Sequence, residues 1–325
     1  MPMALSQEFR QLIATTNANL NTPCEPLAQY LEQGGKRLRP ILCSLCAQAV
    51  GGTAEQAHYA GLTIELFHNF TLIHDDIEDS SLLRRGKPCL HIQHGIPIAI
   101  NLGDLLFCLS TQAMLNAPYT ADEKITLLQI LHQHFIKVFE GQAMELEWHS
   151  HKNWNIHEQD YLSMVECKTG ALIAIACKIG AYLGGASLEQ QKLLYKWGLS
   201  LGVAYQIQDD VLNLTGTEEK YKKEIGGDIT EGKRSLMVLH TLNNQAVTQK
   251  DKQKLKSILD SKTIDQNAIQ WCITLLTQSG AIAYAQKKST DLISITTTSL
   301  KNTLTPTPAR EKLLQLAYSL ITREA

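Results

Sequence analysis

Two short acidic segments stand out because each lies in an otherwise apolar stretch. The first contains Asp75, Asp76 and Asp79, and the second contains Asp209 and Asp210. On a helix, at about 100° per residue, Asp75 and Asp79 lie one turn apart on the same face, and Asp76 lies close to Asp79. Carboxylates so close together repel each other at neutral pH unless cations neutralise them, and hard oxygen ligands suit Mg²⁺ that also coordinates substrate phosphate. Each segment is therefore a candidate metal site.

A solvated acidic helix end is the alternative for either segment taken alone. Residues 64–73, which precede the first segment, are largely apolar, and the second segment also lies on a largely apolar helix. A fully solvated face is therefore disfavoured. Because helices can face each other across a cavity, two such segments on separate long helices predict a polynuclear Mg²⁺ site between them.

Basic residues form three clusters that fit a phosphate ligand. The first lies in residues 34–40, where three cations follow two glycines at a helix start, and free backbone N–H groups there also bind phosphate. The other two clusters are Arg84-Arg85 and Lys233-Arg234. A basic cluster alone can be solvated surface. Cations beside carboxylate clusters instead predict a diphosphate held partly by metal and partly by guanidinium groups.

The elements that must position these residues are helices, because apolar residues recur at three- and four-residue spacing almost throughout. We expect helices over residues 5–18, 25–33, 38–50, 54–79, 95–117, 121–150, 157–183, 188–213, 233–244, 248–259, 265–279, 281–303 and 308–323. No sheet is expected. The two acidic segments lie near the ends of two long helices, so we expect one helical domain over residues 1–325, built around a shared site.

Composition excludes several classes of protein. The chain has 30 Lys and Arg against 32 Asp and Glu, for a net charge of −2, so no global field attracts nucleic acid or an anionic membrane. No window of about 18 residues is uninterruptedly apolar, so stable membrane insertion is not expected. Eight cysteines in 325 residues are too few for a disulfide scaffold, and they indicate reduced thiols in the cytoplasm.

The ordered series of motifs from about residue 34 to residue 235 resembles the trans-isoprenyl diphosphate synthases, most closely the short-chain members that make geranylgeranyl diphosphate. The resemblance implies a single-domain, all-α isoprenoid-synthase bundle around a central active-site cavity. It also implies a Mg²⁺-dependent, head-to-tail condensation of isopentenyl diphosphate with an allylic diphosphate (dimethylallyl, geranyl or farnesyl). A homodimer is implied as well.

The resemblance further implies a role for each matching residue. Those expected to bind isopentenyl diphosphate are Lys36, Arg39, His68 and Arg85. Arg84 is expected on the allylic diphosphate, and the residues expected to line that site and act in catalysis are Lys168, Thr169, Gln206 and Lys233. The expected ligands of three Mg²⁺ ions are Asp75, Asp76, Asp79, Asp209 and Asp210, with Asp228 as an outer acid. In the family, the allylic diphosphate ionises, the isopentenyl double bond attacks the cation, and a proton passes to the released diphosphate.

One position departs from the family pattern. The second motif is usually Asp-Asp-x-x-Asp, and here Asn213 replaces the last acid. Asn213 is therefore left out of the metal ligands.

Product length depends on the helix that carries Asp75. Thr71 lies one turn before Asp75, about 40° around the helix, and is small enough to leave space. Phe70 lies about 140° from Asp75, so helix geometry alone would not choose it as the floor of the cavity. An aromatic residue five positions before the first Asp, with no insertion in the motif, nevertheless resembles the geranylgeranyl-forming members. We therefore expect a twenty-carbon product set by Phe70 and Thr71, with fifteen carbons as the alternative and Phe67 as the next candidate.

Three other functions share part of this pattern. A class I terpene cyclase has a helical fold and an acidic metal motif, but it needs no second diphosphate site of the kind that Lys36 and Arg39 indicate. An HD-type metal phosphohydrolase is suggested only by His74-Asp75, and no second acidic helix would be expected there. A regulatory subunit of a heteromeric prenyltransferase tends to lose the aspartates, whereas the first motif is intact here. A prenyltransferase acting on two soluble diphosphates is therefore the leading interpretation.

Overall fold

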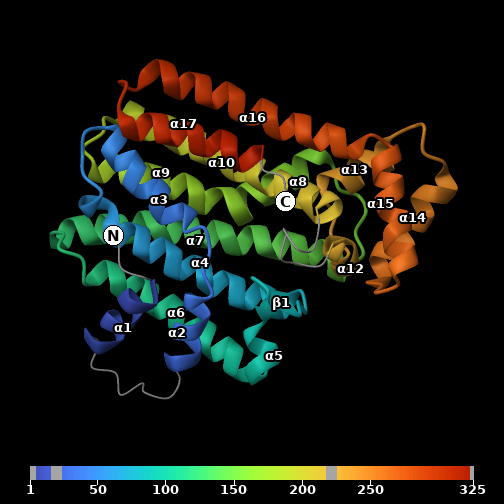
Figure 1. The fold of residues 1–325 in the computed structure, drawn as a ribbon, viewed down its shortest axis with the longest axis horizontal. Helices are drawn as coiled ribbons and strands as arrows, with labels where there is room; N and C mark the ends of the chain where they lie inside the picture. Colours follow the sequence, from blue (N-terminus) through green and yellow to red (C-terminus); the bar gives the residue numbers. More distant parts are fainter. Residues whose placement is uncertain (1–4, 16–23, 217–224, 323–325) are drawn as a thin grey trace. The chain divides into compact units, whose positions relative to one another are not determined.

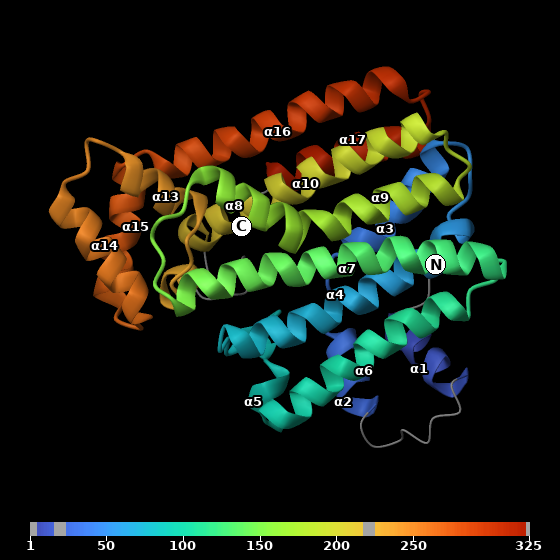
Figure 2. The same cartoon turned by 180° about the vertical axis from the view of Figure 1, so that it is seen from behind.

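A computed structural model describes residues 5–15, 24–216 and 225–322 of the chain. These residues are almost entirely helical, as Figures 1 and 2 show from opposite sides. The predicted all-α class is confirmed. By their contacts the residues divide into two compact units, which are residues 1–132 with 176–191 and residues 133–175 with 192–325. The single domain over 1–325 stays a prediction, and each unit is described in turn.

The first unit is built around one long helix. Its elements are α1 (Leu5–Thr15), α2 (Cys24–Glu32), α3 (Leu38–Ala49), η1 (Glu55–Ala57), α4 (His58–Glu78), β1 (Leu83–Arg84), β2 (Lys87–Pro88), α5 (Leu90–His94) and α6 (Ile96–Leu115), with parts of α7 (Ala121–Ser150), α9 (Ala171–Leu183) and α10 (Leu188–Thr215). α4 packs along α6, and its middle, from Ala60 to Phe67, is buried without interruption. Burial of this kind stabilises the helix through tertiary packing, so the position of the acidic end of α4 is well defined within the unit.

A short hairpin corrects the expectation that the chain contains no sheet. β1 and β2 pair antiparallel, with Arg84 opposite Lys87. The two turn residues, Arg85 and Gly86, have φ of 55° and 77°. Positive φ at both central residues is typical of two-residue hairpin turns, because the twist of such turns matches that of the flanking strands. Two-residue strands are too short to show alternation in a sequence, so the pattern did not predict them.

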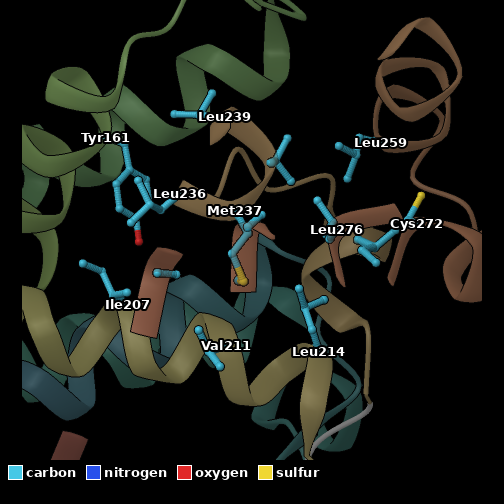
Figure 3. Packing of buried hydrophobic residues seen from close by; sticks show 14 of the residues in the cluster. Tyr161, Ile207, Val211, Leu214, Leu236, Met237, Leu239, Leu259, Cys272 and Leu276 are labelled. Atoms are coloured by element: carbon cyan, nitrogen blue, oxygen red, sulfur yellow. The ribbon is translucent and has the colours of Figure 1, made fainter. Parts of the chain in front are cut away.

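The second unit surrounds an apolar core. Its elements are the rest of α7, α9 and α10, together with α8 (Glu158–Val165), the π-helix η2 (Glu166–Gly170), α12 (Gly227–Glu231), α13 (Leu236–Asn243), α14 (Gln249–Ser261), α15 (Gln266–Gln278), α16 (Ala281–Thr303) and α17 (Pro308–Ile321). Ile207, Val211 and Leu214 of α10 recur at helical spacing and belong to the same buried cluster as Leu236 and Met237 of α13 (Figure 3).

Most predicted helices are present, with ends shifted by a few residues, but four details differ. The helix expected over 157–183 contains the π-helical turn η2, and the helix expected over 233–244 begins only at Leu236. Lys233 and Arg234 therefore lie in a loop. The short helices α5 and α12 were not predicted, because one helical turn carries too little periodicity to recognise.

By length and composition alone, α6 is the one helix in the described residues that is long and apolar enough to cross a bilayer, and 44% of its apolar window is buried inside the protein.

Candidate active site

The first acidic segment occupies the last turns of α4. Asp75 and Asp76 lie within the helix, and Asp79 caps its end, with the backbone N–H of Asp79 donating to the carbonyl of Asp75 at 2.9 Å. Asp76 is 1% exposed, whereas Asp75 and Asp79 are partly exposed. The carboxyl end of a helix carries partial negative charge, so three carboxylates there need a cation nearby.

Arg84 in the hairpin supplies a cation to this segment. Its Nε donates to Oδ1 of Asp76 at 2.7 Å, its Nη2 contacts the same oxygen, and its Nη2 lies 3.5 Å from Oδ2 of Asp75. Burial raises the pKa of the Asp76 carboxyl, and the Arg84 guanidinium acts against that rise. The sequence placed Arg84 near a diphosphate, and the structure places it directly on the carboxylates.

A second cluster in the same unit gathers cations around α4 one to two turns earlier. The half-buried imidazole of His68 has a pKa well below its ordinary value, because desolvation disfavours its charged form and Arg39 and Arg85 repel a further positive charge. The Arg85 guanidinium lies against the glycine loop, since a Cβ built on Gly35 would stand 3.1 Å from its Cζ. The structure therefore brings Arg39, His68, Arg85 and the loop before α3 together, with His68 neutral at pH 7.

Two residues that the sequence did not single out hold this loop. Arg37 Nη1 donates to Oε1 of Glu65 at 3.0 Å, and its Nη2 donates to the Leu31 carbonyl at 2.6 Å. Glu65 is 2% exposed and the side chain of Arg37 is 24% exposed, so the ion pair is a partly buried anchor. Lys36 is exposed beside it.

The aromatic residues predicted to limit product length form a cluster. The ring of Phe70 lies 5.4 Å from the rings of both Phe67 and Phe107, and Phe107 lies 6.3 Å from His132. Phe70 is 4% exposed. Thr71 donates its hydroxyl to the His68 carbonyl at 2.8 Å. Phe107 and His132 come from α6 and α7, so no pattern within the α4 sequence could identify them.

In the second unit, Lys168 and Thr169 lie in the π-helical turn η2. Two helices approach this turn so closely that only glycine fits: a Cβ on Gly141 of α7 would lie 2.4 Å from the Lys168 backbone N, and one on Gly202 of α10 would lie 2.6 Å from the Cα of Gly170. π-turns are rare and occur mostly at functional sites. In this turn the adjacent side chains of Lys168 and Thr169 contact Glu145 and Gln206, respectively.

The hydroxyl of Thr169 begins a chain of hydrogen bonds that ends on the second acidic segment. Thr169 donates to Oε1 of Gln206 at 2.9 Å, and Nε2 of Gln206 donates to Oδ1 of Asp210 at 2.8 Å. The phenol of Tyr161 donates to the other oxygen of Asp210 at 2.7 Å. Burial and the nearby Asp228 carboxyl raise the pKa of Asp210 to about 8. Asp209 is the more exposed of the two acids.

Lys168 forms an ion pair with Glu145 of α7. Burial opposes ionisation of Glu145, but the charges of Lys168 and Lys233 outweigh it and lower the pKa of this carboxyl. Glu145, Lys168, Asp210 and Lys233 line one cavity of about 40 Å³ together with Tyr161, Thr169 and Gln206. Sequence reasoning missed Glu145 and Tyr161, because each meets its partner through contacts remote in sequence.

Asn213, the departure from the family pattern, anchors the backbone of residues 226–228. Its Oδ1 accepts the backbone N–H of Asp228 at 3.1 Å, and its backbone carbonyl accepts the N–H of Gly226 at 2.8 Å. The Lys233 ammonium contacts Asp228 at 3.4 Å and Glu231 at 2.5 Å. The amide thus keeps a structural bond without adding a charge beside Asp210.

The carboxylates in each unit fit Mg²⁺ by their chemistry, since all are hard oxygen donors. Among the described residues, no three His, Cys, Asp or Glu side chains are already arranged to hold a metal ion.

Comparison with known proteins identifies the family. The polyprenyl synthetase family model matches residues 21–276. The short chain isoprenyl diphosphate synthase of Methanothermobacter thermautotrophicus is 36% identical over 291 residues, which are 90% of this chain and 87% of that protein.

Solved structures give the same result. The geranylgeranyl pyrophosphate synthetase of Pyrococcus horikoshii is 34% identical with a TM-score of 0.89, over 99% of this chain and 95% of that one. A geranylgeranyl pyrophosphate synthase from Corynebacterium glutamicum, complexed with isoprenyl diphosphate and magnesium, has the same fold at 24% identity, with a TM-score of 0.89 over 98% of this chain and 96% of that one. The resemblance noted from the motifs is confirmed, and the chain belongs to the polyprenyl synthetase family.

Proposed function

We propose that this chain condenses isopentenyl diphosphate with an allylic diphosphate and that its main product is geranylgeranyl diphosphate. As a member of its family it is a trans-prenyltransferase that makes short-chain prenyl diphosphates. One observation carries the choice of two diphosphate substrates. The first unit holds two chemically different clusters along α4: carboxylates with Arg84 at its end, and Arg39 and Arg85 around His68 one to two turns earlier.

Mg²⁺ would be held by Asp75, Asp76 and Asp79 of the first acidic segment and by Asp209 and Asp210 of the second, and we propose three ions per site. The bound ions would neutralise the allylic diphosphate as it leaves. Support comes from the oxygen donor set and from the related synthase complexed with magnesium.

The chain's own residues supply the remaining electrostatics. Negative charge grows on the allylic diphosphate as its bond to carbon breaks, and the ammonium groups of Lys168 and Lys233 are fixed charges that stabilise it. Glu145 and Asp228 hold these two ammonium groups at the cavity. On the other substrate, Lys36, Arg39 and Arg85 bind the diphosphate, and His68 donates a hydrogen bond without adding charge. The proton lost after attack passes to the released diphosphate.

The aromatic cluster around Phe70 supports the twenty-carbon product. Phe67, Phe70 and Phe107 are in ring contact with one another, so a growing chain that reaches Phe70 meets a packed wall rather than a single movable side chain. A fifteen-carbon product is the alternative.

A homodimer is also proposed. In the first unit Ile92, Ile96 and Leu115 are 51%, 51% and 48% exposed, and Ile125 is 55% exposed. Ile92 and Ile96 lie four positions apart, on α5 and at the start of α6, and exposed large aliphatic residues of this kind indicate an interaction surface. Size-exclusion chromatography with light scattering tests this, and a monomer at micromolar concentration would refute it.

The cytoplasm is the proposed compartment. The structure describes the side chains of seven of the eight cysteines, and these seven are free thiols, as expected in a reducing environment.

The test of function uses the purified full chain with Mg²⁺, isopentenyl diphosphate and each allylic primer in turn, followed by sizing of the dephosphorylated products. We expect consumption of isopentenyl diphosphate by the chain alone and a twenty-carbon alcohol. A fifteen-carbon alcohol would favour the farnesyl alternative. Hydrocarbon from an allylic diphosphate alone would indicate a cyclase, and no turnover without a second chain would indicate a regulatory subunit.

A further inference from the structure

Three side chains from separate segments of the second unit close a triangle beside Lys233. The Arg234 guanidinium lies 4.1 Å from the centre of the Trp154 ring, and its Nη2 donates to Oδ1 of Asp260 at 2.6 Å. Trp154 Nε1 donates to Oδ2 of the same carboxylate at 2.9 Å. Trp154 lies in the loop between α7 and α8, and Asp260 lies near the end of α14. Each member of the triangle therefore contacts both of the others.

The triangle is a largely buried assembly rather than a surface ion pair. Arg234 is 3% exposed, and the side chain of Asp260 is 19% exposed. The Nη1 of Arg234 also donates to the carbonyl of Gly232. Only a planar guanidinium can stack on a ring while its two terminal nitrogens donate to different acceptors, so lysine cannot reproduce the arrangement.

Arg234 is adjacent to Lys233, and its contacts fix the backbone on both sides of that residue. The Lys233 N–H donates to the Asp228 carbonyl at 2.8 Å, and the Lys233 ammonium contacts Asp228 and Glu231. No regular helix supports this stretch, because α12 ends at Glu231 and α13 begins at Leu236. Side-chain contacts must therefore hold Lys233 in place, whereas helix packing holds Lys168.

We propose that Trp154, Arg234 and Asp260 are positioning residues that hold the Lys233 ammonium in the cavity. Arg234 also lines that cavity, but its terminal nitrogens are directed to Gly232 and Asp260, so it acts through Lys233. The proposal rests on the proposed function, in which Lys233 binds the allylic diphosphate.

The experiment compares Arg234→Lys with a matched control, Arg310→Lys. Arg310 is a buried arginine of the same unit, 6% exposed, whose guanidinium donates to the Lys301 and Leu304 carbonyls and pairs with Glu311. Both variants remove a buried guanidinium and keep a positive charge. We expect Arg234→Lys to lower kcat/KM for the allylic substrate by roughly tenfold to a hundredfold, as a displacement of about 1 Å can. The KM for isopentenyl diphosphate should not change, and Arg310→Lys should change neither constant.

Two further measurements separate positioning from general destabilisation. Hydrogen exchange of the substrate-free protein should be faster at residues 226–235 in Arg234→Lys and unchanged there in Arg310→Lys. In a double-mutant cycle with Lys233→Gln, the Arg234→Lys effect on kcat/KM should largely disappear, because one variant acts through the other.

Additive losses, or unchanged exchange at 226–235, would overturn the proposal. Wild-type kinetics in Lys233→Gln would instead refute the assignment of Lys233 to the allylic site, and the functional half of the inference with it. The exchange result would still test the anchor itself.

Discussion

At the scale of single residues, the two neighbouring acids Asp75 and Asp76 differ in what surrounds them. Asp76 is buried and forms a close ion pair with Arg84. Asp75 is partly exposed, and its contact with the same guanidinium is longer, at 3.5 Å. Asp75→Asn should therefore abolish Mg²⁺-dependent turnover with little change in the free energy of unfolding. Asp76→Asn should also abolish turnover, and it should lower the free energy of unfolding by about 1–3 kcal/mol, because Arg84 loses its buried anionic partner and keeps only the longer contact with Asp75. Urea denaturation beside the turnover assay measures both, and equal stability losses would contradict the distinction.

Asp210 gives the substrate-free protein a pH dependence of stability. Its folded pKa of about 8 lies above the ordinary value of 3.8. Between those two pH values the Asp210 carboxyl is ionised in the unfolded chain and protonated in the folded protein. Its contribution to the free energy of unfolding is therefore fully present below about pH 4 and is lost as the pH rises toward 8. The slope should reach about 1.4 kcal/mol per pH unit. Denaturant midpoints of wild type and Asp210→Asn, taken from pH 5 to 7 without metal, should converge at low pH, and parallel curves would refute the assignment.

At the scale of elements, the π-turn η2 depends on two glycines. A Cβ on Gly141 would stand 2.4 Å from the Lys168 backbone N, so Gly141→Ala must displace the turn and its ion pair with Glu145. We expect a loss of at least tenfold in kcat and about 1–3 kcal/mol in the free energy of unfolding, as overpacking gives. Glu147→Ala, at an exposed position of the same helix, is the matched control and should leave both quantities unchanged.

The packing of α4 against α6 determines the expected product length. Phe70→Ala should open space toward Phe107 and shift products beyond twenty carbons, whereas Thr71→Phe should shorten them toward fifteen. Chromatography of the dephosphorylated products measures the product length of both variants. An unchanged distribution in Phe70→Ala would place the limiting wall elsewhere, with Phe67 as the next candidate.

Helices were predictable because buried faces repeat every three or four residues over many turns, as Ile207, Val211 and Leu214 do. The hairpin and η2 were not, since two-residue strands and a single wide turn leave no period to recognise. The same limit applies within the site. Acids and cations were visible as clusters in the sequence, but Glu145 reaches Lys168, and Tyr161 reaches Asp210, only through contacts across 23 and 49 positions.

At the scale of the whole molecule, the chain carries two acidic segments, and the proposed reaction requires both. If Mg²⁺ and an unreactive allylic diphosphate analogue bind to the two segments together, the two ligands added together should stabilise the protein more than either ligand added alone. At ligand concentrations about 100 times the dissociation constant, the gain should be about 2.7 kcal/mol. Asp75→Asn and Asp209→Asn should each remove most of the rise in Tm, and the double variant should lose little more, because either change already breaks the shared site. Losses that add, each about half of the rise, would mean that the segments bind independently, and the proposal of one polynuclear site would then be wrong.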